Sequence, residues 1–117
     1  MKRRKIKMEI IRKSRDFTAA EMVHFVQGSS EKMKSCIGSI VPLDDFLLYK
    51  APNHEGESQT VLAVKSGDKI FATISKTFIS DFVGCVEMFE NCGEHLKEFF
   101  VTEGTSKNGR KFIKCEV

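Results

Sequence analysis

The chain has no tryptophan, one tyrosine and two prolines among its 117 residues, and no long uncharged apolar run. Without such a run, a membrane-spanning helix is not expected. The basic start, residues 1–5, is followed by further charged residues as far as Arg15, so it lacks the apolar region of a secretion signal. We therefore expect a cytoplasmic protein that does not act on membranes. The length predicts a single domain.

Motifs for metal binding and catalysis are also missing. The four cysteines, at positions 36, 85, 92 and 115, form no Cys-x-x-Cys pair. They are expected to be reduced thiols that pack as small apolar side chains, with no metal or other cofactor. The three histidines are scattered, and no phosphate-binding glycine loop or His-Glu-x-x-His motif is present. These features predict a binding protein and not an enzyme.

Charge is unevenly distributed along the chain. Residues 1–50 contain 11 Lys or Arg and 6 Asp or Glu, whereas residues 51–117 contain 8 basic and 10 acidic residues. Four basic residues and no acidic one lie in residues 105–115, and acids predominate in residues 77–104. Such segregation favours an anionic partner on one face of the molecule, although basic termini can also serve solubility alone.

Local patterns predict the order of the elements. Apolar residues alternate in residues 5–12, which indicates a strand, and Thr18-Ala19-Ala20-Glu21 is a capping box that starts a helix. Residues 31–36 can form a short helical turn. Strands are then predicted at 37–50 (bent at Pro42), 59–65, 69–74, 96–102 and 110–117. An apolar stripe at positions 79, 82, 86 and 89 indicates a helix over residues 76–91, between the third and fourth of these strands.

This order predicts a mainly β fold. A long bent strand, two more strands, a helix and a final hairpin make up a five-stranded barrel of the oligonucleotide/oligosaccharide-binding (OB) type. The barrel would span residues 36–117, and residues 1–35 would form a basic strand-and-helix extension of the same domain. Other α+β folds share this order, so the barrel is the leading candidate among several.

Two strands carry phenylalanine between cations on one face. By strand parity Phe71 lies beside Lys69, and Phe112 lies between Arg110 and Lys114. Rings that alternate with cations are typical of surfaces that stack bases and bind phosphates. The alternative is that both rings belong to the core beneath the N-terminal helix. The predicted nucleic-acid-binding residues are Tyr49, Lys65, Lys69, Phe71, Lys76, Lys107, Arg110, Lys111, Phe112 and Lys114.

Two segments carry a resemblance to a known family. Residues 58–79, with Phe71-Ala72-Thr73-Ile74-Ser75 at the end of a strand, and residues 102–113, with the turn from Gly104 to Arg110, resemble small single-stranded DNA-binding proteins of phages and mobile elements. The resemblance covers roughly residues 33–117. It implies coating of single-stranded DNA during replication or recombination, with replication proteins as further partners. One departure is the loop of residues 51–57, which contains Glu55 and Glu57 and no lysine or arginine, although the corresponding loop of OB folds often contacts DNA.

The sequence thus predicts a sequence-tolerant binder of single-stranded DNA. RNA remains open, because no residue identifies a contact to a 2′-hydroxyl. The alternative is a small protein-interaction module, such as a phage-type regulator or inhibitor of a host protein. The acidic helix face of Asp81, Glu87, Glu90 and Glu94 favours that alternative.

Overall fold

A computed structural model describes residues 8–27, 30–53 and 55–117. The strands are β1 (Glu9–Lys13), β2 (Glu31–Lys32), β3 (Ile40–Pro42), β4 (Asp45–Pro52), β5 (Ser58–Ser66), β6 (Lys69–Thr73), β7 (Glu98–Thr105) and β8 (Lys111–Glu116). The helices are α1 (Ala19–Gln27) and α2 (Lys76–Asn91), with a short 3₁₀ turn, η1 (Met33–Cys36). The prediction of a mainly β protein is confirmed. No helix of the described residues is long and apolar enough to span a membrane.

The strands form two sheets. The larger sheet has the order β1-β4-β5-β6-β2, and the smaller sheet has the order β3-β7-β8. The predicted long strand with its bend at Pro42 is divided into β3 and β4, so that it contributes to both sheets. Among the described residues neither sheet closes on itself, and β6 does not pair with β8. The predicted closed barrel is therefore not observed in the described residues.

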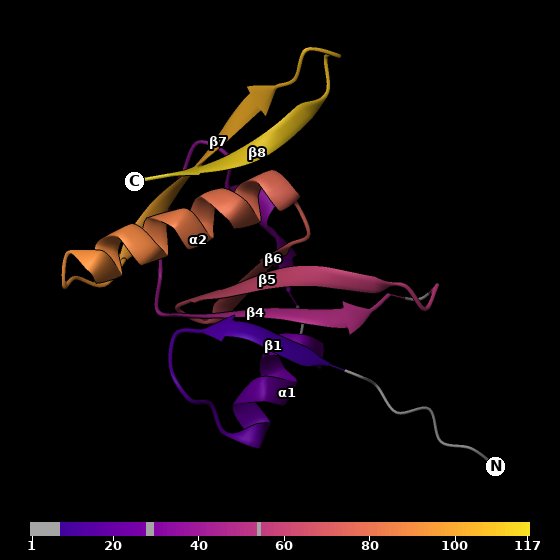
Figure 1. The fold of residues 1–117 in the computed structure, drawn as a ribbon, viewed down its shortest axis with the longest axis vertical. Helices are drawn as coiled ribbons and strands as arrows, with labels where there is room; N and C mark the ends of the chain where they lie inside the picture. The colour runs from indigo at the N-terminus through magenta and orange to yellow at the C-terminus, as the bar shows by residue number, and fades with distance from the viewer. Residues whose placement is uncertain (1–7, 28–29, 54) are drawn as a thin grey trace.

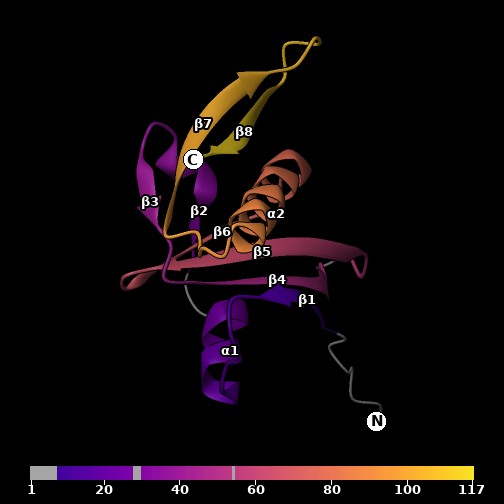
Figure 2. The ribbon, with the colours of Figure 1, turned by 60° about the vertical axis from the view of Figure 1, so that its left-hand side comes forward.

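Helices cover both faces of the larger sheet. Figures 1 and 2 show α1 on one side of it and α2 on the other side, between the two sheets, with the β7–β8 hairpin projecting beyond the rest of the molecule. The main core lies on the α2 side and contains the fully buried Phe78, Phe82 and Phe99. A second cluster, with Leu47 and Tyr49, lies on the α1 side. Both faces of β4 are consequently buried.

Several local predictions are confirmed by hydrogen bonds. The Thr18 N–H donates to Glu21 Oε1 at 3.0 Å and the Glu21 N–H donates to Thr18 Oγ1 at 3.2 Å, which is the reciprocal pattern of a capping box. Ser75 caps α2, because its Oγ accepts a hydrogen bond from the Phe78 N–H. In the β7–β8 turn Gly109 adopts a φ of 78°, a conformation that favours glycine.

The predicted N-terminal extension is part of the larger sheet. Strand β1 pairs antiparallel with β4, and β2 pairs parallel with β6 through Glu31–Phe71 and Lys32–Ala72. Residues 1–7, which include the basic start and the first three residues of the predicted first strand, lie outside the described residues. Strand pairing therefore places residues 9–13 and 31–32 in the same sheet as β4, β5 and β6.

Candidate functional site

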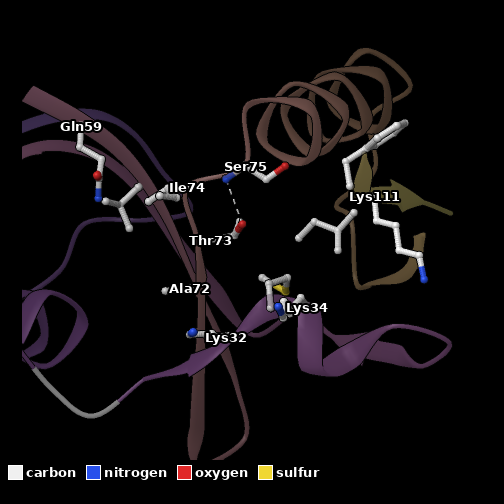
Figure 3. A pocket seen from close by; sticks show the side chains of 12 residues that line it. Lys32, Lys34, Gln59, Ala72, Thr73, Ile74, Ser75 and Lys111 are labelled. Atoms are coloured by element: carbon white, nitrogen blue, oxygen red, sulfur yellow. Dashed lines mark hydrogen bonds between the residues drawn. The ribbon is translucent and has the colours of Figure 1, made fainter. Parts of the chain in front are cut away.

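A hollow of the surface lies between β6 and β8. It has a volume of about 580 Å³ and is bounded by the end of β6, the start of α2, the start of β8 and the segment from β2 to η1. Figure 3 shows Lys111 on one side of it and Gln59 and Ile74 on the other, with Lys32 and Lys34 along its lower edge. We name it the seam groove. It is lined by Lys32, Met33, Lys34, Gln59, Val61, Ala72, Thr73, Ile74, Ser75, Lys111, Phe112 and Ile113.

The groove is basic at its rim. None of the described residues that line it is acidic, and no carboxylate of the described residues lies within ion-pair distance of Lys32 or Lys34. Lys111 has one carboxylate partner, Glu103, at 3.8 Å across the β7–β8 ladder. Three ammonium groups around a hollow without acids produce a positive potential there, which attracts anions.

The walls of the groove contain both apolar and polar side chains. Ile74, which follows β6, is 57% exposed and supplies an apolar surface to the groove. The Ser75 N–H donates to Thr73 Oγ1 at 3.1 Å (Figure 3), which leaves the Thr73 hydroxyl hydrogen free to donate. A flat, partly apolar wall with hydroxyl and amide groups suits a ligand that has both ring faces and hydrogen-bonding edges.

Phe112 is held at the groove by its cross-strand neighbour. It pairs with Gly104 on β7, and a Cβ atom added to Gly104 would lie 2.7 Å from the Cε2 and Cζ atoms of the Phe112 ring. The ring therefore lies directly over the glycine backbone, in space that any other residue would fill. Phe112 is half-buried, so part of its surface remains available to a ligand.

The predicted site residues are divided among three places. Lys111 and Phe112 line the seam groove, and Lys76 follows Ser75 at its helical edge. Exposed Lys107 and Arg110 lie in the adjoining turn of the hairpin, and half-buried Lys114 lies two residues beyond Phe112 on β8. The C-terminal part of the predicted set, from Lys107 to Lys114, is thus brought together near the groove.

Lys69 and Phe71 lie elsewhere, in a separate hollow on the other side of β2 and η1. Lys69 forms an ion pair with Glu31 at 3.6 Å, and Phe71 is half-buried against the main core. Strand parity places Phe71 on a solvent-facing surface, whereas in the structure this face of β6 also packs against the main core, so the ring is only partly exposed. Phe71 therefore does not share a hollow with Phe112.

Tyr49 and Lys65 lie on the α1 side of the larger sheet. Tyr49 is 6% exposed, and burial raises the pKa of its hydroxyl. A ring enclosed beneath α1 cannot stack on a base, so Tyr49 leaves the candidate set. Lys65 lines a hollow of about 210 Å³ beside α1, where two carboxylates, Glu21 and Asp45, already pair with Arg15. Alternation along β6 and β8 would place Ile74 and Val117 on the same faces as buried Ile70 and Cys115, yet they are 57% and 72% exposed, because each follows the last residue of its strand.

Sequence reasoning missed the lysines of the β2–η1 segment. Residues 31–36 were expected to form a helical turn, which η1 confirms for Met33–Cys36, but no role was predicted for Lys32 or Lys34. The available signal was the alternation Lys32-Met33-Lys34. Met33 is fully buried, so it anchors the segment while the two lysines on either side remain exposed at the groove.

Two carboxylates of the acidic face expected on α2 form ion pairs within the molecule. Arg12 of β1 forms ion pairs with Glu87 and Glu90, and one carboxylate oxygen of Asp81, Oδ2, is buried without a hydrogen-bond partner among the described residues. This face therefore offers less free charge than the sequence indicated. No group of three or more metal-ligating side chains occurs in the described part of the chain.

Comparison of the chain with models of known protein families, with curated proteins and with solved structures found no match.

Proposed function

We propose that this protein binds single-stranded nucleic acid, with single-stranded DNA as its ligand, in the seam groove. The observation that carries the proposal is the groove itself: three lysines, no acidic lining residue among those described, and an aromatic ring held at its edge. Lysines would bind the phosphates, and Phe112 and Ile74 would contact base faces. Each such base–aromatic contact is worth about 1–3 kcal/mol.

The position of the groove supports the same function. It lies between the loop that precedes β5 and the β7–β8 hairpin, across the ends of β5 and β6. In an OB fold the corresponding strands and loops bind oligonucleotides. Together with the element order and the division of the bent strand between two sheets, this supports an OB-like arrangement with an open seam.

The biological setting of the proposal comes from the sequence. The resemblance of residues 58–79 and 102–113 to phage and mobile-element proteins supports the coating of single strands in replication or recombination. Contacts to phosphates and to base faces carry little sequence information, so binding would tolerate many sequences.

An anisotropy titration with fluorescent oligothymidine tests the proposal. Lys32→Gln combined with Lys34→Gln should weaken binding and reduce the magnitude of the log affinity–log salt slope by about 1.4, because two phosphate contacts are lost. Lys13→Gln combined with Lys97→Gln is the matched control. It removes the same charge, but Lys13 lies on β1, the opposite edge of the larger sheet from β2. Equal losses in both double variants, or equal affinity for duplex DNA, would refute binding in the groove.

A further inference from the structure

A second groove lies at the other end of α2. It has a volume of about 390 Å³ and is bounded by β3, the last turn of α2, the segment before β7 and Val117. Helix α2 runs from Lys76, next to the seam groove, to this end, and its 16 residues correspond to about 24 Å. We name this hollow the far groove. It is separate from the seam groove and shares no lining residue with it.

The floor of the far groove is apolar and unusually exposed. Ile40 and Phe100 are cross-strand partners on the outer face of the smaller sheet, since their neighbours Val41 and Phe99 are buried in the core. Ile40 is 57% exposed and Val117 is 72% exposed, and Phe89 of α2 adds a half-buried ring. Single exposed apolar residues are ordinary, but a group that lines one concave surface marks a site for a partner.

The rim of the far groove is acidic, in contrast to the seam groove. Glu94 and Glu98 line it, and Glu116 is the cross-strand partner of Phe100. None of these three carboxylates forms an ion pair within the described part of the chain, and Lys97 is the one lysine of the lining. Free carboxylates repel the phosphates of nucleic acid and attract cationic side chains.

We propose that the far groove docks a segment of another protein that carries apolar side chains flanked by lysine or arginine. The apolar side chains would cover Ile40 and Phe100, and the cations would pair with Glu94 and Glu98. This inference goes beyond the proposed nucleic-acid function and does not depend on it. Because the two grooves lie at opposite ends of α2, one molecule could hold a nucleic acid and a protein at once.

Binding of defined peptides tests the inference without any oligonucleotide. The probes are short synthetic peptides with two leucine or phenylalanine residues flanked by lysine, by serine or by glutamate. The lysine-flanked peptides should bind best, and Ile40→Glu should weaken that binding at least about tenfold, since truncation or charging of a central apolar contact is typically that costly. Val23→Glu is the matched control, because Val23 is 54% exposed on α1.

Further variants and a measurement of oligomeric state decide whether the far groove binds such a peptide. If Glu94→Lys combined with Glu98→Lys reverses the preference toward glutamate-flanked peptides, the acidic rim is the specificity element. The inference is overturned if no lysine-flanked peptide binds, or if Ile40→Glu and Val23→Glu bind alike. It is also overturned if sedimentation shows a dimer that Ile40→Glu dissociates, because the occupant is then a second copy. The Lys32→Gln, Lys34→Gln variant should bind peptides normally, which separates this test from that of the seam groove.

Discussion

Replacement of Phe112 by alanine distinguishes a binding ring from a core ring. A fully buried phenylalanine costs about 3–5 kcal/mol of unfolding free energy when it is truncated. Phe112 is half-buried on an outer sheet face and contacts the Gly104 backbone. A phenylalanine buries about 150–250 Å² when it is fully enclosed, so truncating a half-covered ring should cost about 2 kcal/mol at roughly 25 cal/mol per Å².

The expected effect on binding is of similar size. Loss of one stacked ring should weaken the affinity for oligothymidine by about 1–3 kcal/mol, or roughly 5- to 150-fold in Kd. Urea denaturation followed by far-ultraviolet circular dichroism gives the stability, and fluorescence anisotropy gives Kd. The role assigned to this ring would be refuted if Kd of the folded protein were unchanged while the unfolding free energy fell by about 3–5 kcal/mol, as for a fully buried ring.

Two further variants make the result unambiguous. Gly104→Ala keeps the ring but places a Cβ 2.7 Å from its outer atoms, so the ring must move from the groove edge. This variant should therefore weaken binding as Phe112→Ala does. Leu48→Ala is the control from β4; Leu48 is 4% exposed in the main core and does not line the groove. It should cost about 2–5 kcal/mol of stability and leave the affinity of the folded fraction unchanged.

Four other predictions concern charge, pH, thiol access and capping. If the three lysines of the seam groove each bind one phosphate, log affinity should fall with log salt with a slope of about −2, measured by anisotropy across a salt series. Hydrogen bonding from Arg15 lowers the pKa of Glu21 to about 2 from its ordinary 4.5. As the pH falls, the Glu21 carboxylate is therefore protonated in the unfolded chain before it is protonated in the folded protein. Stability should decrease as the pH drops from about 4.5 toward 2. Urea midpoints measured at several pH values should show a weaker dependence on pH for Arg15→Gln. Burial beside Cys85 raises the pKa of the Cys115 thiol, whereas Cys92 is exposed, so Ellman's reagent should label Cys92 first and Cys115 only after unfolding. Ser75→Ala removes the cap of α2 and should lower the unfolding free energy by about 1 kcal/mol in urea titration.

Elements that are determined by neighbouring residues could be predicted from the sequence. The capping box at Thr18 and the stripe that buries Phe82 and Val86 in α2 both appear where the patterns place them. The glycine turn at Gly109 does so as well. Each of these signals depends on a few adjacent side chains and on backbone conformations that they favour or exclude, so the rest of the chain has little influence on them.

Which face of a strand meets solvent was harder to predict, because parity gives two faces and does not say what covers each. On β6 Ile70 lies under α1, whereas Phe71 meets the main core, so both faces are covered. Tyr49 on β4 is enclosed for the same reason. A sheet with helices on one side only has one face exposed to solvent. The larger sheet has α1 on one side and α2 on the other, so that assumption does not apply to it.

Which strand pairs with the edge of β6 was also not predictable from the sequence. That pairing determines where the candidate site lies. In a closed barrel of this strand order the free edge of β6 would pair with β8. In the structure β2 occupies that edge, in a parallel pairing at Phe71 and Ala72. Such pairing depends on chain that lies about 40 residues away from β6 in sequence, and no local pattern in either segment specifies it.

This exchange of partners explains why the groove and its lysines occur together. Because β2 ends at Lys32, it covers β6 only as far as Ala72, and β6 is unpaired on that side from Thr73 onward. Met33 then anchors η1 in the core, which fixes Lys32 and Lys34 on either side of a buried residue at the mouth of the opening. The short segment that pairs with the edge of β6 thus also supplies two of the three cations of the groove. A variant that shortens residues 30–36 should therefore change the shape of the site and its charge together, whereas substitution of the lysines alone changes only the charge.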